Sequence, residues 1–273
     1  MSLLGTNTLI LGATGTGKTY CIRTLIEAGI TPFILFTENG MRTLGDVPED
    51  QLHWHYIAAG TSSWGTMMDS AKKIGTMNFK ALASLSDIDR SKYTQFYDIL
   101  NCMNNFTCQR TGESFGDIST WGTDRAIIVD SLSGLSTIAM DLVVGSKPTK
   151  SMSDWGVAMD NLERFLNKMC LDTKCHFIMN GHLERELDEI SGGIQLMPAT
   201  LGKKLPPKIP RYFDDVVYCQ RKGEKFTWST AATNIDLKAR NLPIATDQEP
   251  SFVPLINSWK EAGGVIESAE KAA

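Results

Sequence analysis

The chain has 273 residues, of which 42% are hydrophobic and 21% charged, so it is long enough to bury a core and is not disordered, collagenous or coiled-coil. Its 27 Lys and Arg residues against 31 Asp and Glu give a net charge of -4, which excludes a protein that coats nucleic acid through bulk positive charge. No apolar run approaches the roughly 20 residues of a membrane span, and no signal-peptide pattern opens the sequence. We therefore expect a soluble, cytoplasmic protein without a membrane partner, whose six scattered cysteines stay reduced.

The first third of the chain predicts a strand, a turn, a helix and a second strand. Residues 8–11 are apolar and run into a glycine-rich turn. Ile22, Leu25 and Ile26 follow at helical spacing and predict a helix over residues 18–28. Residues 32–37 have strand length and β-forming composition. This order is typical of a parallel β-α-β unit.

Residues 39–125 are predicted to form an insertion. It contains a strand over residues 52–58, helices over residues 64–74 and 92–103, and a mobile surface segment over residues 107–123. His53 and His55 alternate along the strand, and no second ligand pair at metal-site spacing accompanies them. We expect both histidines on one exposed strand face.

The second half returns to regular structure. Residues 126–130 are a β-branched run that predicts a strand buried on both faces, and residues 153–171 and 176–180 predict a helix and another strand. Residues 183–210 are proline-rich and predict a long loop, and residues 213–220, 226–230 and 234–238 predict closing strands. The prediction is one α/β domain over residues 1–273, with a mostly parallel sheet flanked by helices, antiparallel closing strands and a short C-terminal tail from about residue 250.

Residues 12–19 carry the strongest chemical signal, because they satisfy the pattern G-x-x-x-x-G-K-[ST] between a predicted strand and a predicted helix. Glycines allow the backbone N–H groups and the helix N-terminus to converge on phosphate oxygens. The lysine reaches the β and γ phosphates, and the threonine hydroxyl ligates Mg²⁺. The expected nucleotide-binding residues are Gly12, Ala13, Thr14, Gly15, Thr16, Gly17, Lys18 and Thr19.

Asp130 closes the buried strand, where a carboxylate can hold the Mg²⁺ hydration shell together with Thr19; a helix-capping aspartate is the alternative. Ser131 and Leu132 stand where many ATPases place a glutamate, so the base that orients the attacking water must come from elsewhere. Glu38, at the end of the second strand, is the candidate. An exposed turn residue is the alternative reading of Glu38, and Glu184 is the fallback base.

The segment from residue 126 to residue 135 resembles the Walker B segment of RecA-type recombinases, which also have a glutamate that closes the second strand. The whole chain resembles RecA-core ATPases encoded by phages, among them the Sak-type single-strand annealing and recombination proteins. The resemblance spans roughly residues 5 to 245, and only the phosphate loop and the Asp130 strand carry specific motifs. It implies a RecA-like fold, use of ATP and Mg²⁺, and assembly into a ring or filament.

The same resemblance implies roles for four further residues. It makes His182, and more loosely Asn180, a sensor of the γ phosphate, and it makes Lys238 and Arg240 fingers that reach the ATP of a neighbouring subunit. A cation supplied in this way neutralises charge on the transferred phosphoryl group. A hydrogen-bonded histidine at a strand end and a solvated strand face are the structural alternatives.

Two basic segments follow the strands after which RecA-like proteins place their DNA loops, and both can contact phosphates. A solvated basic loop is the alternative for each. The candidate DNA-binding residues are Lys147, Lys150, Lys203, Lys204, Lys208 and Arg211.

Three functions remain open from the sequence. The first is an ATPase that acts on single-stranded DNA in phage recombination, annealing or replication, with a single-strand binding protein as a possible partner. The second is an ATP-dependent oligomeric switch or scaffold for a protein partner, which the negative net charge favours. The third is a ring-helicase or packaging motor, against which the lack of a second domain counts. GTP is not excluded as the nucleotide.

Overall fold

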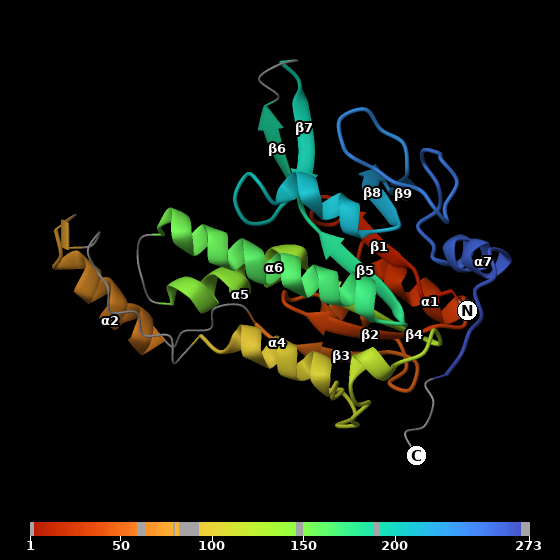
Figure 1. The fold of residues 1–273 in the computed structure, drawn as a ribbon, viewed down its shortest axis with the longest axis horizontal. Coiled ribbons are helices and arrows are strands. Elements are labelled where there is room, and N and C mark those ends of the chain that lie inside the picture. Colours follow the sequence, from red (N-terminus) through yellow and green to blue (C-terminus); the bar gives the residue numbers. More distant parts are fainter. Residues whose placement is uncertain are drawn as a thin grey trace.

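The computed structural model describes residues 3–58, 64–78, 80–81, 93–145, 150–187 and 192–268. A seven-stranded sheet in the order β3-β2-β4-β5-β1-β8-β9 forms its centre (Figure 1). The strands are β1 (Asn7–Leu11), β2 (Thr31–Phe36), β3 (His53–Tyr56), β4 (Arg125–Asp130), β5 (His176–Gly181), β8 (Asp215–Lys222) and β9 (Lys225–Ser229). All neighbours pair in parallel except β8 and β9. The predicted α/β fold is therefore confirmed.

Helices cover both faces of this sheet (Figure 1). The α-helices are α1 (Thr24–Glu27), α2 (Trp64–Gly75), α4 (Gln95–Asn104), α5 (Leu132–Val144), α6 (Met152–Asp172) and α7 (Val253–Glu261). The 3₁₀ helices are η1 (Tyr20–Arg23), η2 (Met41–Leu44), η3 (Ile118–Thr120) and η4 (Pro206–Tyr212). Among the described residues, no helix combines the length and apolar character that a membrane crossing needs.

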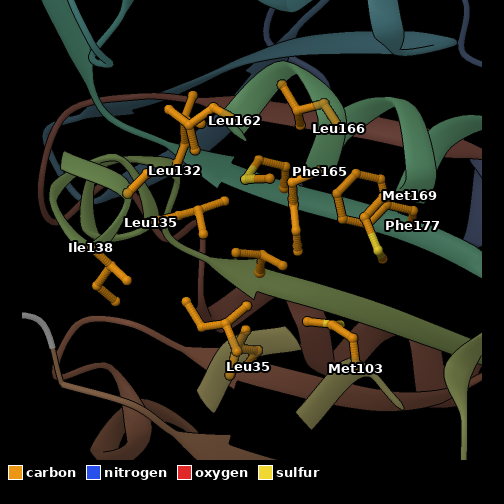
Figure 2. Packing of buried hydrophobic residues seen from close by; sticks show 14 of the residues in the cluster. Leu35, Met103, Leu132, Leu135, Ile138, Leu162, Phe165, Leu166, Met169 and Phe177 are labelled. Atoms are coloured by element: carbon orange, nitrogen blue, oxygen red, sulfur yellow. The ribbon is translucent and has the colours of Figure 1, made fainter. Parts of the chain in front are cut away.

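Alternate residues of the central strands enter two separate cores, as the period of two in a strand requires. Leu35, Val129 and Phe177 pack with α4, α5 and α6 on one face, where Figure 2 shows Leu135, Phe165 and their neighbours meeting over the sheet. Their strand neighbours pack against η1, α1 and α7 on the other face. Burial on both faces explains why these strands are continuous apolar runs in the sequence.

The helix predicted over residues 18–28 is shorter than expected. It is divided into η1 and a single α-helical turn, α1. The Thr24 hydroxyl donates to the Cys21 carbonyl oxygen at 2.7 Å, which is the local side-chain competition that disfavours continuous α-helix. Backbone groups of the loop itself, rather than a long helix, therefore surround the expected phosphate site.

Residues 183–210 do not form the predicted loop. They contain an antiparallel hairpin of β6 (Leu183–Leu187) and β7 (Ile194–Pro198), followed by η4. The hairpin projects from the body of the molecule at the top of Figure 1. Pro206 and Pro207, which suggested a loop, occupy the first turn of η4, where no backbone N–H is needed.

Helix α5 was not predicted at all, because its sequence lacks a polar face. Both sides are buried, so the 3.6-residue alternation that reveals a surface helix is absent. The only local signal is Ser131, whose hydroxyl oxygen accepts a hydrogen bond from the Gly134 N–H as the N-cap.

Two further predictions are wrong in detail. The segment 107–123 is not a mobile surface insertion, because Cys108 and Trp121 are fully buried and Trp121 packs on Phe33. His53 is likewise buried and stacks on Phe33, so the face of β3 that carries it is not exposed. Residues 234–238 form isolated bridges to β7 and β8 rather than a strand.

Gln109 closes the outer edge of β3. Its backbone N–H donates to the Trp54 carbonyl oxygen at 2.8 Å. Its side-chain amide pairs with both backbone groups of Tyr56, accepting from the N–H at 2.9 Å and donating to the carbonyl at 3.3 Å. One residue of an irregular segment thus satisfies three backbone groups of an edge strand.

His176 makes folding stability depend on pH. Burial lowers the pKa of its imidazole to about 4, and Nδ1 accepts a hydrogen bond from the Thr6 N–H at 3.0 Å. Between pH 6.5 and pH 4 the unfolded chain binds a proton that the folded chain does not, so this group lowers the free energy of unfolding by roughly 3 kcal/mol as pH falls through that window. Denaturant unfolding at pH 7 and pH 4.5 measures the loss. His176→Gln should show a smaller loss, and an equal loss in both proteins would contradict the assignment.

Candidate active site

The glycine-rich loop between β1 and η1 has the backbone that phosphate binding requires. Gly15 and Gly17 have positive φ angles of 77° and 89°, a region that other residues rarely adopt. A Cβ atom on Gly12 would lie 2.5 Å from the Cys219 carbonyl oxygen of β8, so the loop can approach its neighbour only with glycine there. Each of the three motif glycines therefore has its own steric reason.

Lys18 is buried inside its own loop. Its ammonium group donates to the carbonyl oxygens of Gly12 at 2.8 Å and Ala13 at 2.9 Å. Burial lowers the pKa of Lys18, while the neighbouring Asp130 carboxylate opposes that change. Both carbonyl partners belong to the phosphate loop, so the cation is already held where an incoming phosphate chain would lie.

Thr19 and Asp130 join the phosphate loop to the end of β4. The Thr19 hydroxyl donates to Asp130 Oδ2 at 2.6 Å. Burial raises the pKa of Asp130, and the hydrogen bond from Thr19 opposes the rise. A hydroxyl and a carboxylate at this separation fit the oxygen donor set that Mg²⁺ takes beside nucleotide phosphates. Among the described residues, no group of three or more His, Cys, Asp or Glu side chains could hold a metal ion by itself.

The Glu38 carboxylate is held by two side chains from neighbouring strands. Oε1 accepts a hydrogen bond from the Ser131 hydroxyl at 2.6 Å, and Oε2 lies 3.1 Å from His182 Nε2. The hydrogen bond with His182 lowers the pKa of Glu38 most, and that with Ser131 adds to the effect against partial burial. Glu38 is thus an ionised, oriented carboxylate at the same sheet edge as the phosphate loop.

Thr37 fixes the backbone that carries Glu38. Its hydroxyl donates to the Ser131 carbonyl oxygen at 3.0 Å and accepts from the Ser131 N–H at 2.9 Å. A Cβ atom on Gly134 would lie 2.3 Å from the Thr37 hydroxyl oxygen, so the first turn of α5 needs glycine to pack here. Sequence reasoning missed Thr37 and the role of Ser131, because neither residue type marks catalysis by itself.

The other proposed sensor residue lies beside the metal-binding carboxylate. Asn180 is opposite Asp130 in the register of β5 and β4, is fully buried, and helps to lower the pKa of Asp130. His182 contacts Glu38, as described above. Glu184, the fallback base, lies two residues further on, exposed in β6, where it is paired with Met197.

Lys238 and Arg240 lie at the opposite edge of the sheet from the phosphate loop. The Lys238 ammonium donates to the Phe213 carbonyl oxygen at 2.6 Å, and Arg240 forms an ion pair with Asp214 at 2.7 Å. Both partners immediately precede β8, whose first residue Asp215 is opposite Thr8 at the start of β1. The phosphate loop follows the other end of β1. Within one chain these two cations are therefore engaged far from the nucleotide site.

The basic segments come together at Trp155, near the start of α6. The Lys150 ammonium lies 5.2 Å from the centre of the Trp155 ring. Gly202 packs on the same ring, since a Cβ there would lie 3.8 Å from Trp155 Cε3, and Lys203 and Lys204 follow it as exposed residues. Sequence reasoning found no aromatic residue among these cations, because Trp155 belongs to a helix.

The remaining candidates for DNA contact differ in their surroundings. Lys208 forms an ion pair with Glu163 of α6 at 2.6 Å, and Arg211 is exposed in η4. Lys147 lies outside the described residues.

A comparison with protein families places residues 5–249 in a single match to the AAA domain model. The chain belongs to the AAA domain family. This AAA domain is a P-loop ATPase, and the loop at residues 12–19 supplies the motif that gives such enzymes their name. No curated protein sequence matches it.

Solved structures with similar folds include two secretion ATPases and a recombinase. The ATPase of a type III secretion system of pathogenic bacteria is 13% identical with a TM-score of 0.40, and the match covers 80% of this AAA domain chain and 53% of that chain. The assembled ATPase EscN of enteropathogenic E. coli is 14% identical (TM-score 0.39, coverage 80% and 43%). The RadB recombinase is 12% identical (TM-score 0.36, coverage 89% and 86%). The chain thus spans about half the length of the secretion ATPases.

Proposed function

We propose that the chain hydrolyses ATP in the presence of Mg²⁺ and couples hydrolysis to single-stranded DNA. The observation that carries the DNA part is the meeting of Lys150, Lys203 and Lys204 around the Trp155 ring. A groove that binds single strands combines cations for the phosphates with an aromatic ring on which a base can stack. The resemblance to phage-encoded RecA-core proteins supports a role in recombination, annealing or replication.

The nucleotide part of the proposal assigns a task to each group at the sheet edge. Lys18 and the loop N–H groups bind the phosphates, and Thr19 and Asp130 would hold Mg²⁺, which supplies positive charge to the phosphate oxygens when it is bound. Glu38 accepts a hydrogen bond from the attacking water and orients it. Ser131 and His182 keep the Glu38 carboxylate in place through the contacts at 2.6 Å and 3.1 Å.

We also propose that several copies assemble. Helix α2 lies at the far left of Figure 1 and exposes an apolar face, on which Trp64 is 82% accessible and Met67, Met68 and Ile74 are also exposed. Contiguous exposed apolar residues mark interaction surfaces. This face supports a second copy as the partner, and it equally favours the alternative function, an ATP-dependent switch that binds another protein. In an assembly, Lys238 and Arg240 would have to leave their contacts to reach a neighbour's nucleotide.

Hydrolysis measured with and without single-stranded DNA over a salt series tests the DNA coupling. We expect stimulation that fades with salt, because phosphate contacts release counterions. Lys203→Ala with Lys204→Ala should reduce the slope of log affinity against log salt by about 1.4, from about 0.7 per lost phosphate contact on a single strand. Lys168→Ala, which removes a cation paired with Asp172 on α6, is the matched control. Hydrolysis that is indifferent to DNA would favour the protein-partner function.

A further inference from the structure

The sheet order fixes the direction in which a bound nucleotide must run. β1, which leads into the phosphate loop, has β5, β4 and β2 on one side and β8 and β9 on the other. Asp130, Glu38 and His182, the groups that serve the terminal phosphate under the proposed function, all belong to the first side. A triphosphate with its terminal phosphate at these groups extends its nucleoside toward β8 and β9.

An exposed aromatic ring stands at that place. Phe226 of β9 is 40% exposed, and a Cβ atom on Gly17 of the phosphate loop would lie 3.2 Å from its Cδ1 atom. Trp228, two residues later on the same face of the strand, is buried in the core. Phe226 therefore continues the apolar row of β9 beyond the core, up to the phosphate loop.

A cation accompanies the ring. Arg221 is the cross-strand partner of Phe226 in β8, and its guanidinium carbon lies 5.4 Å from the centre of the ring. The Arg221 Nε donates to the Gly223 carbonyl oxygen at 2.8 Å, which fixes the side chain along the hairpin. A planar cation beside an exposed ring is a combination that stacks well with a nucleobase.

A second exposed aromatic residue near the loop lies on the wrong side. Tyr20 follows Thr19 directly and is 55% exposed, with the Arg23 guanidinium 4.0 Å from the centre of its ring. Arg23 pairs with Asp46 and with the Thr43 carbonyl oxygen of η2. Because η2 follows β2, Tyr20 faces the side of the terminal phosphate rather than that of the nucleoside.

We propose that Phe226, with Arg221 beside it, is the platform on which the base of the bound nucleotide stacks. The inference rests on the proposed function for the placement of the phosphates. Stacking recognises the face of a ring and not its edge, so the platform accepts both purines and holds pyrimidines less well because their rings are smaller.

The test compares ATP with inorganic tripolyphosphate, which has the phosphate chain but no base. Equilibrium affinities of the full-length protein with Mg²⁺ are measured for both ligands. Phe226→Leu, which keeps an apolar side chain against Gly17, and Phe226→Ala should each weaken ATP binding about tenfold or more and leave tripolyphosphate binding unchanged. Phe226→Trp should retain ATP binding, and Tyr20→Ala is the matched control that should change neither affinity.

Each other outcome overturns a distinct statement. Unchanged ATP affinity in Phe226→Leu and Phe226→Ala, or an equal loss for both ligands, would overturn the platform, the second result because the ring would then only support the loop. A loss of ATP binding confined to Tyr20→Ala would place the base on the other side. Wild-type protein that binds neither ligand would overturn the phosphate site, and this inference with it.

Discussion

Replacing Lys18 by alanine is expected to lower ATP turnover at least about a hundredfold, the usual cost of removing one preorganised charge donor from a transition state. The effect is large because Lys18 is buried, with its ammonium group 2.8 Å and 2.9 Å from two carbonyl oxygens of the loop that would surround the phosphates. No other described cation makes contacts within that loop. Phosphate release under saturating ATP measures the loss.

The matched variant is Lys18→Arg, which keeps the charge. We expect it to remain defective, because the guanidinium is wider than the ammonium group that fits between the Gly12 and Ala13 carbonyl oxygens. Thermal unfolding of both variants checks that the chain still folds. Turnover close to that of the wild type in Lys18→Ala would remove the phosphate-binding role from residues 12–19.

Glu38→Gln is expected to lower turnover by about 10² to 10⁴ while nucleotide affinity is kept, since this is the range for loss of a catalytic acid or base. The amide has the shape of the carboxylate and retains an oxygen that can accept from Ser131 or His182, so the site should stay assembled. It loses the negative charge that orients and polarises water. Single-turnover hydrolysis separates this effect from nucleotide binding.

Glu184→Gln distinguishes the two candidate bases. Glu184 is exposed in β6, whereas Glu38 is bonded to two side chains beside the phosphate loop. A large loss in Glu184→Gln together with normal turnover in Glu38→Gln would transfer the role to Glu184. Ser131→Ala should give an intermediate loss, because it frees one oxygen of the Glu38 carboxylate without removing the charge.

The sequence predicted the sheet edge of this site and missed what holds it together. The phosphate loop, the Asp130 strand and Glu38 each follow an apolar run, so the rule that parallel strands end at one edge was enough to bring them near one another. The contacts of Ser131, Thr37 and Gly134 join residues nearly a hundred positions apart and depend on α5. That helix is buried on all sides and has no amphipathic pattern to reveal it.

The same limit applies to the surfaces proposed for DNA and for the base. Lys150, Lys203 and Lys204 were visible as charges, but the ring they share comes from α6. Phe226 read as an ordinary strand residue, because its place against Gly17 arises only when β8 pairs with β1. Local patterns report which residue types are present, and the order of strands decides which of them meet.

Gln109 restricts how copies of this protein can associate. A free edge strand is a template onto which another chain can add a strand of its own. At β3 that route is closed, because Trp54 and Tyr56 already spend their outward backbone groups on Gln109. Self-association at this end of the sheet must therefore proceed through side-chain surfaces, and a continuous intermolecular sheet through β3 would require the 107–123 segment to peel away first.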